Sequence, residues 1–128
     1  MRRDRRLRAI AIEHNEDRLQ LIAKNAIALG TPNLKIVKGY APAVLPNLET
    51  PDAIFIGGGI STAGLFTMCW KALNLGGRLV ANAVTIESEA LLIDLHQEFG
   101  GELIRIAISK SRPLGKTTGW KTYMPILQ

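Results

Sequence analysis

The chain has 128 residues, of which 47% are hydrophobic and 21% charged, and its formal net charge is +5 at pH 7. This length suits one domain, and the hydrophobic fraction argues against a disordered chain. The single cysteine, Cys69, excludes an internal disulfide and a multi-cysteine zinc site, and neither histidine has a metal-ligand spacing, so we expect no bound metal. The positive charge favours an anionic partner, whether nucleic acid, a polycarboxylate or a phosphorylated ligand.

The N-terminal segment is rich in arginine, which occurs at positions 2, 3, 5, 6 and 8. This run is either a nucleic-acid-binding arm or, as we favour, a solvated loop or helix end. No apolar run in the chain is long enough for a signal peptide or a membrane span. We therefore expect a cytoplasmic protein that makes no membrane contact.

Apolar patterns predict strands and helices that alternate along the chain. Short apolar runs predict strands at residues 8–13, 34–38, 52–56 and 77–83. Apolar residues at helical spacing predict helices at residues 19–27, 65–73 and 91–99, the first ended by Gly30 and Pro32. Residues 102–109 and about 122–127 read as two final strands, with a basic loop between them. The sequence therefore predicts an α/β doubly wound, mainly parallel sheet with a C-terminal antiparallel hairpin, which binds ligands at the carboxyl ends of its strands.

Three consecutive glycines follow the predicted strand at residues 52–56, in the sequence AIFIGGGISTAG. A dinucleotide fingerprint would need glycine or alanine where Thr62 stands, and no Gly-Lys-Ser/Thr follows as in a P-loop. The stretch is thus not predicted to cradle a phosphate. Glycine at this place indicates either a turn with positive φ or a close approach of the backbone to a ligand, and both interpretations remain open.

Glu13 ends the first predicted strand. A carboxylate at this position of a doubly wound sheet can accept hydrogen bonds from both hydroxyls of a ribose. A helix cap or a solvated acid in a loop is the competing interpretation.

Five segments together resemble a known family: AIAIEHNEDRLQLIAKNAIALG, VKGYAPAVL, DAIFIGGG, VANAVTIESEALL and SRPLGKTTGWKTYMPILQ. From Ala9 onward the chain is similar to the decarboxylating precorrin methyltransferases of cobalamin biosynthesis. It resembles the C-terminal domain of the larger members and also the free-standing members. The resemblance implies the class I S-adenosylmethionine-dependent methyltransferase (Rossmann-like) fold, a single methyltransferase-like domain over residues 1–128, and S-adenosyl-L-methionine as cofactor.

The same resemblance assigns candidate site residues. Glu13 matches the acid that holds the cofactor ribose, and Gly39, Tyr40 and Ala41 match the loop beside the adenine. Gly57, Gly58 and Gly59 match the end of the family's fourth strand, which faces the methionine part of the cofactor and the substrate cleft. The family's own glycine motif and first strand are absent, because the chain starts at the family's second strand. Since that first strand lies between the second and fourth, either those neighbours pair directly or the chain is a fragment.

The implied reaction is methylation of a precorrin ring carbon, coupled to loss of an acetate side chain as carbon dioxide. No catalytic residue is assigned, because the sequence suggests no Ser/His/Asp or Cys/His constellation. Arg112 and Lys116 are candidate contacts to an anionic side chain of the substrate, and a solvated basic loop is the competing interpretation. Trp120 is a candidate for stacking on the substrate, and an anchor in the core is the competing interpretation. Asn82 and Thr85 are candidates for lining the cleft, although we favour Thr85 as a helix N-cap.

The resemblance also implies partners: an anionic tetrapyrrole, a homo-oligomer that is a tetramer in the free-standing members, and an upstream tetrapyrrole methylase domain. Two alternatives stay open. The arginine-rich start suits a nucleic-acid methyltransferase or binding domain of the same fold, but IGGG stands where such enzymes often carry an Asn/Asp-Pro-Pro-aromatic tetrad. The other alternative is a non-catalytic subunit or fragment, whose exposed sheet edges favour association.

Overall fold

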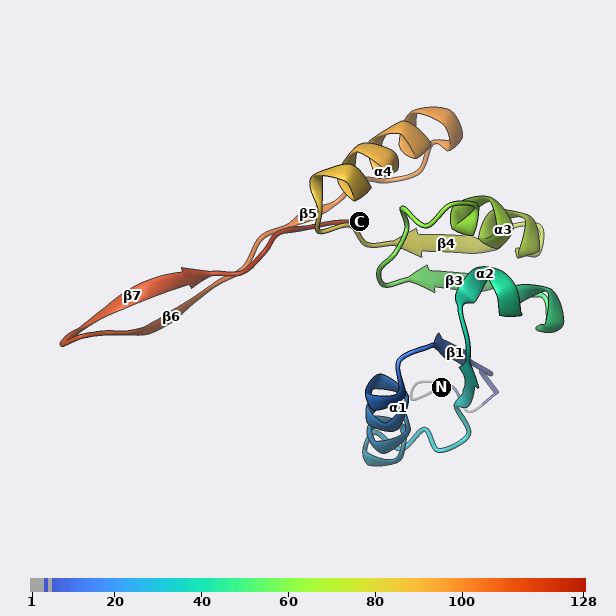
Figure 1. The fold of residues 1–128 in the computed structure, drawn as a ribbon. Coiled ribbons are helices and arrows are strands. Elements are labelled where there is room, and N and C mark those ends of the chain that lie inside the picture. Colours follow the sequence, from blue (N-terminus) through green and yellow to red (C-terminus); the bar gives the residue numbers. More distant parts are fainter. Residues whose placement is uncertain (1–3, 5) are drawn as a thin grey trace. The chain divides into compact units, whose positions relative to one another are not determined.

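The computed structural model describes residue 4 and residues 6–128. The chain divides into two compact units, and the boundary between them in the sequence lies between Glu49 and Thr50. Each unit is described by itself (Figure 1). Of the arginine-rich start, positions 2, 3 and 5 lie outside the described residues. Arg6 pairs with Asp4 at 2.8 Å, and Arg8 pairs with Glu49 at 2.8 Å, both arginines being largely exposed. The nucleic-acid arm therefore remains a prediction.

The first unit is built on two short parallel strands. Strand β1 (Ile10–Glu13) pairs with β2 (Lys35–Lys38) in a register that runs from Ile10 opposite Lys35 to Glu13 opposite Lys38. Helix α1 (Glu16–Ala28) connects them, and the short helices α2 (Ala41–Val44) and η1 (Leu45–Asn47) follow β2. Because the strands are parallel, both of their carboxyl ends lie at one edge of this sheet.

Helix α1 begins where its sequence offers a cap, since the side chain of Asn15 accepts a 3.0 Å hydrogen bond from the N–H of Arg18. The predicted apolar face is confirmed at Leu19 and Ala26, which are buried. It is wrong at Ile27, which is 72% exposed in spite of its helical spacing. The contacting face of α1 is therefore narrower than the apolar pattern suggests.

The second unit starts with the same arrangement. Strands β3 (Ala53–Ile56) and β4 (Arg78–Ala81) are parallel, with Ala53 opposite Arg78 and Ile56 opposite Ala81. Helix α3 (Leu65–Ala72) lies between them in sequence, and α4 (Ile86–Phe99) follows β4. The buried apolar residues of this unit are Ile56, Ile60, Leu65, Cys69, Ala81, Ala83, Leu92 and Leu127. Among the described residues, no helix is both long and apolar enough to cross a membrane.

The C-terminal strands confirm one predicted pairing and correct one predicted loop. Strands β5 (Arg105–Ile106) and β8 (Ile126–Leu127) pair antiparallel, as expected for the final strands. The segment predicted as a basic loop is instead a second hairpin, β6 (Ser109–Leu114) with β7 (Thr117–Thr122). Gly115 has φ +60° and begins a two-residue turn with Lys116, a geometry that suits the twist of a hairpin. Figure 1 shows this hairpin extending beyond β5 and β8.

Candidate active site

Glu13 lies at the carboxyl end of β1, where the chain turns into α1. Its Oε1 accepts hydrogen bonds from the backbone N–H groups of His14, at 2.8 Å, and Asn15, at 2.9 Å. The guanidinium of Arg18 stands 3.6 Å from Oε2, and the Glu13 side chain is only 17% exposed. The carboxylate is thereby held in one orientation by groups from the start of the helix.

These contacts also fix the charge of Glu13. The backbone hydrogen bond from Asn15 is the main cause that lowers the pKa of this carboxyl, and the hydrogen bond from His14 and the charge of Arg18 act in the same direction. Partial burial opposes them without reversing the shift. Glu13 is therefore an anion at neutral pH, and its Oε2 keeps acceptor capacity for a hydroxyl group.

The turn after β2 lies beside Glu13. The N–H of Gly39 donates a 3.0 Å hydrogen bond to the carbonyl oxygen of Glu13. The ring of Tyr40 stacks on that of His14, with centroids 4.4 Å apart and planes 16° from parallel, and Tyr40 is 66% exposed. Ala41 begins α2 directly after it. The structure thus brings Glu13, Gly39, Tyr40 and Ala41 to one edge of the first unit, around an accessible aromatic ring.

His14 is a residue that the sequence interpretation missed. Its side chain is half exposed, and one face of its ring is covered by Tyr40. Its Nδ1 also lies 3.2 Å from Oε1 of Glu13. The stacking of His14 on Tyr40 joins the ends of two strands that are distant in sequence, so no local sequence signal identifies it.

The three glycines after β3 differ in their surroundings. Gly59 has φ +75°, and its carbonyl oxygen accepts a 2.8 Å hydrogen bond from the N–H of Thr62, so Gly59 belongs to a turn. A Cβ at Gly57 would stand 3.1 Å from the ring of Phe55. A Cβ at Gly58 would meet nothing within 4 Å. The turn interpretation accounts for Gly59, whereas no contact among the described residues requires glycine at position 58.

Asn82 is held beside these glycines. Its N–H donates a 2.9 Å hydrogen bond to the carbonyl oxygen of Ile56, the residue before Gly57. Its side-chain oxygen accepts a 2.9 Å hydrogen bond from the side chain of Gln128. Thr85 is the N-cap of α4, as favoured, because its hydroxyl oxygen accepts a 3.2 Å hydrogen bond from the N–H of Ser88. The edge that presents Gly57 therefore also presents Asn82.

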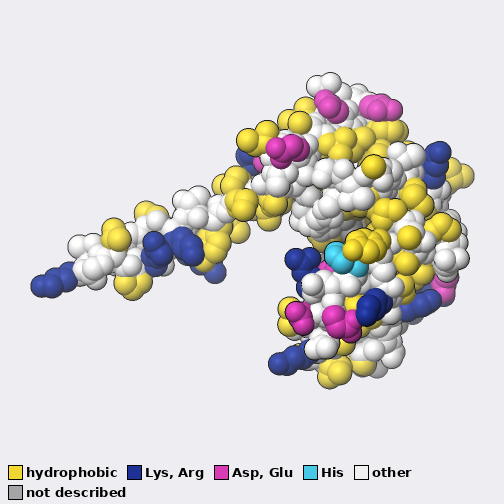
Figure 2. Space-filling view, in the orientation of Figure 1, with side chains coloured by type: hydrophobic (Ala, Val, Ile, Leu, Met, Phe, Trp, Pro, Cys, Tyr) yellow, Lys and Arg dark blue, Asp and Glu magenta, His cyan; other side chains and the backbone are white. Residues whose placement is uncertain are grey.

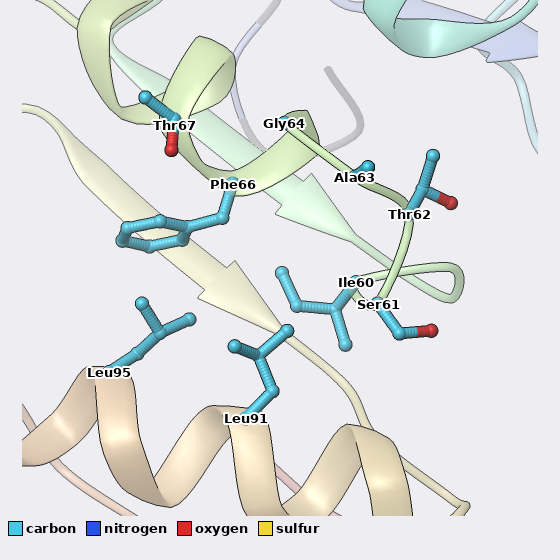
Figure 3. A pocket seen from close by; sticks show the side chains of 9 residues that line it. All are labelled: Ile60, Ser61, Thr62, Ala63, Gly64, Phe66, Thr67, Leu91 and Leu95. Atoms are coloured by element: carbon cyan, nitrogen blue, oxygen red, sulfur yellow. The ribbon is translucent and has the colours of Figure 1, made fainter.

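A cavity of about 300 Å³ opens next to the glycine turn and was not predicted from the sequence. Figure 3 shows the side chains of Ile60, Phe66, Leu91 and Leu95 converging on it from the turn, α3 and α4. Ser61, Thr62 and Thr67 contribute the polar side chains of its lining. Such a wall accepts an apolar group and offers little to a charged one.

The remaining candidates lie on the β6–β7 hairpin. Arg112 is in β6, Lys116 is in the turn, and Trp120 is in β7. Trp120 is 77% exposed, so the interpretation of this residue as a core anchor is wrong. Residues 109–122 contain no acidic residue, and Figure 2 shows lysine and arginine side chains gathered on this projection.

Two of the three lysines of the hairpin are opposite each other across its strands. Lys110 lies opposite Lys121, and their Nζ atoms lie 5.9 Å and 5.5 Å from the centre of the Tyr123 ring. Because directly opposed like charges destabilise a hairpin, this face is suited to an anion. Among the described residues, no group of three or more His, Cys, Asp or Glu side chains has the arrangement of a metal site.

Comparison with known proteins identifies the family. The precorrin methyltransferase domain family matches residues 1–128. The chain is 50% identical over 125 residues to precorrin-6Y C(5,15)-methyltransferase [decarboxylating] of Sinorhizobium sp, and the match covers 98% of this chain and 30% of that protein. The protein of the same name from Mycobacterium tuberculosis is 42% identical over 120 residues, again with 30% of its length covered. The chain thus spans about 30% of the length of these curated relatives.

Solved structures agree. The C-terminal domain of precorrin-6Y C5,15-methyltransferase from Rhodobacter capsulatus has a TM-score of 0.85 at 49% identity, with 94% of this chain and 65% of that chain covered. A precorrin-6Y C5,15-methyltransferase domain from Corynebacterium diphtheriae has a TM-score of 0.87 at 37% identity, with 99% and 75% covered. The predicted α/β fold of the class I S-adenosylmethionine methyltransferases is confirmed. This chain belongs to the precorrin methyltransferase domain family.

Proposed function

We propose that this chain is the methyltransferase part of an enzyme that methylates a precorrin ring carbon and couples this step to decarboxylation of an acetate side chain, in cobalamin biosynthesis. Its membership of the family and the activity for which relatives up to 50% identical are named support the proposal. The observation that carries the cofactor part is the oriented, ionised carboxylate of Glu13 at a strand's carboxyl end, beside the accessible ring of Tyr40.

The residues of the first unit fit S-adenosyl-L-methionine. Oε1 of Glu13 is occupied by two backbone N–H groups, so Oε2 is the atom available to a ribose hydroxyl. The free face of Tyr40 is available to a planar base, because only its other face is covered by His14. The cofactor, when bound, supplies an electrophilic methyl group.

In the second unit, Gly57 and Gly58 are proposed cofactor contacts. Gly58 in particular leaves its backbone uncovered on the side where a Cβ would stand, so a ligand atom can approach it closely. We propose Gly59 and Asn82 as contacts to the substrate at the same edge. Methyl transfer requires in-line positioning more than a dedicated base, which agrees with an edge built from backbone and amide groups.

The basic hairpin supports a substrate that carries several carboxylates. We propose that Arg112 and Lys116 hold carboxylate side chains of the tetrapyrrole and that exposed Trp120 stacks on its ring system. We further propose an upstream domain, because the matched relatives are about three times as long as this chain and the solved Rhodobacter capsulatus relative is a C-terminal domain. A homo-oligomer is proposed from the family resemblance alone.

Calorimetric titration with S-adenosylhomocysteine tests the cofactor part. The Glu13→Gln variant is expected to weaken binding about tenfold or more, because it removes a charged acceptor for the ribose. The matched control is Glu16→Gln, since Glu16 also stands at this edge but is paired with Lys38. If the folded chain does not bind, or if both variants bind equally, the assigned role of Glu13 is wrong.

The hairpin is tested with a polycarboxylate porphyrin as the probe. Arg112→Gln is expected to weaken binding, whereas Arg78→Gln, which makes the same change on β4, is expected to leave it unchanged. A hairpin that instead binds RNA, with affinity falling steeply as salt is added, would favour the nucleic-acid alternative.

A further inference from the structure

Gln128, directly after β8, lies opposite Asn82, directly after β4. The register follows from the neighbouring residues, because Ala83 and Leu127 exchange two backbone hydrogen bonds, of 2.8 Å and 2.9 Å, in an antiparallel bridge. The next pair along such a bridge is not hydrogen-bonded through its backbone, and the side chains of such a pair lie close together. Gln128 is held there by two further backbone hydrogen bonds with Ile104, of 2.8 Å and 2.9 Å.

The side chains of Asn82 and Gln128 meet in one hydrogen bond. Nε2 of Gln128 donates to Oδ1 of Asn82 across 2.9 Å, while the backbone N–H of Asn82 is bound to the carbonyl oxygen of Ile56. Within the second unit, Nδ2 of Asn82 donates to no described residue. A carboxamide has an acceptor end and a donor end. The bond from Gln128 occupies the acceptor end of Asn82 and leaves the donor end for another partner.

The sequence around this carboxamide favours a negatively charged partner. Three segments meet at this end of the β3–β4 pair, and none contains an aspartate or a glutamate: residues 56–64, 81–86 and 123–128. A carboxylate that approaches Nδ2 of Asn82 therefore meets no like charge from these segments. Hydrogen bonds from N–H donors to ionised acceptors are also stronger than those to neutral ones.

We propose that Gln128 is a positioning residue, which orients the carboxamide of Asn82 so that Nδ2 donates to a carboxylate oxygen of the substrate. This inference rests on the proposed function, in which Asn82 contacts a tetrapyrrole that carries several carboxylates. Gln128 acts through Asn82 and needs no contact of its own with the substrate. Its side chain therefore matters for binding only while Asn82 is present.

A double-mutant cycle tests this dependence. The full chain is titrated with uroporphyrin, whose side chains are acetates and propionates, and binding is followed by fluorescence. The near-isosteric Asn82→Leu is expected to weaken binding about tenfold, and Gln128→Met about threefold. Added to Asn82→Leu, the Gln128→Met change is expected to have no further effect. Additive losses, or unchanged affinity in Gln128→Met alone, overturn the proposal.

Reversing the polarity of the contact is a sharper test. The side chain of Gln128→Glu only accepts hydrogen bonds, so it is expected to attract Nδ2 of Asn82 and turn Oδ1 toward the substrate. Binding of uroporphyrin should then be weaker than in Gln128→Met. Gln97→Glu on α4 is the matched control for the added charge and is expected to retain affinity. Unchanged affinity in Gln128→Glu shows that position 128 accepts from Asn82, which overturns the proposal.

Two further measurements separate this inference from the proposed function. Without ligand, the NMR signals of the Gln128 side-chain amide are expected to shift in Asn82→Leu, and unchanged signals overturn the hydrogen bond. If they shift but the unsubstituted chain does not bind uroporphyrin, the proposed function fails, and the role of Gln128 in binding is overturned with it. Affinity for S-adenosylhomocysteine is expected to be equal in the unsubstituted chain and Gln128→Met. A loss there assigns the Asn82 donor to the cofactor carboxylate and overturns the assignment to the substrate.

Discussion

The N–H of Gly39 donates a hydrogen bond to the carbonyl oxygen of Glu13 across 3.0 Å, and this contact ties the turn after β2 to the last residue of β1. The two residues are 26 positions apart, yet both belong to the proposed cofactor edge. The geometry around Glu13 therefore depends on the stability of this turn.

Replacing Gly39 with alanine is expected to destabilise the first unit by about 1 to 3 kcal/mol, the usual range for overpacking. A Cβ at this position would stand 2.5 Å from Cγ1 of Val44, on a backbone with φ +156°. Urea unfolding followed by circular dichroism measures the change. Gly30→Ala is the control for positive φ alone, because nothing lies within 4 Å of its Cβ position. An equal cost in both variants would show that contact with Val44 is unimportant.

The lowered pKa of Glu13 predicts a pH dependence of stability. A carboxyl group with a lower pKa in the folded state stabilises that state above its unfolded pKa, about 4.3 for glutamate. This contribution is lost as the pH falls through the lower, folded pKa. The free energy of unfolding is therefore expected to decrease below about pH 4.3, and less so in Glu13→Gln. Identical acid profiles of the two proteins would contradict the assigned hydrogen bonds.

The glycines at 58 and 59 are expected to respond differently to alanine. Gly58→Ala should leave the free energy of unfolding within about 0.5 kcal/mol, because its Cβ meets open space. Gly59→Ala should lower stability, since it forces alanine to φ +75°. Only Gly58→Ala is therefore expected to weaken S-adenosylhomocysteine binding without a thermal shift. Unaltered affinity in this variant would remove Gly58 from the site.

Thr85→Ala is expected to cost about 1 kcal/mol through loss of the N-cap of α4. Thr85→Ser keeps the hydroxyl oxygen and should retain most of the stability. Thermal unfolding of both variants provides the comparison. If serine is as destabilising as alanine, the methyl group of Thr85 rather than its hydroxyl is what the helix start requires.

The sequence predicts most elements because their signals are local. Apolar runs located β1 to β4, and Thr85 stood where a cap was expected. The β6–β7 hairpin was not predicted because Gly, Thr and Lys are typical of loops. In the structure, residues of these types form exposed, paired strands on either side of a turn that begins at Gly115.

For the candidate site, the position of Glu13 at a strand end could be predicted from the pattern of the chain. Its fixed orientation could not, because this depends on backbone amides at the start of α1. The stacking of Tyr40 on His14 joins two segments that only the folded register places together. The apolar cavity beside Ile60 likewise depends on the packing of α3 and α4.

The hairpin formed by β6 and β7 leaves and re-enters the second unit between two strands that are themselves paired. Arg105 and Ile106 of β5 are joined to Leu127 and Ile126 of β8, and the N–H of Tyr123 donates to the carbonyl oxygen of Ile108. The two ends of the excursion are thus held at the spacing of neighbouring strands. The tip of the hairpin is consequently a modular insertion, which evolution or an engineer can shorten, lengthen or exchange without changing the connectivity beneath it.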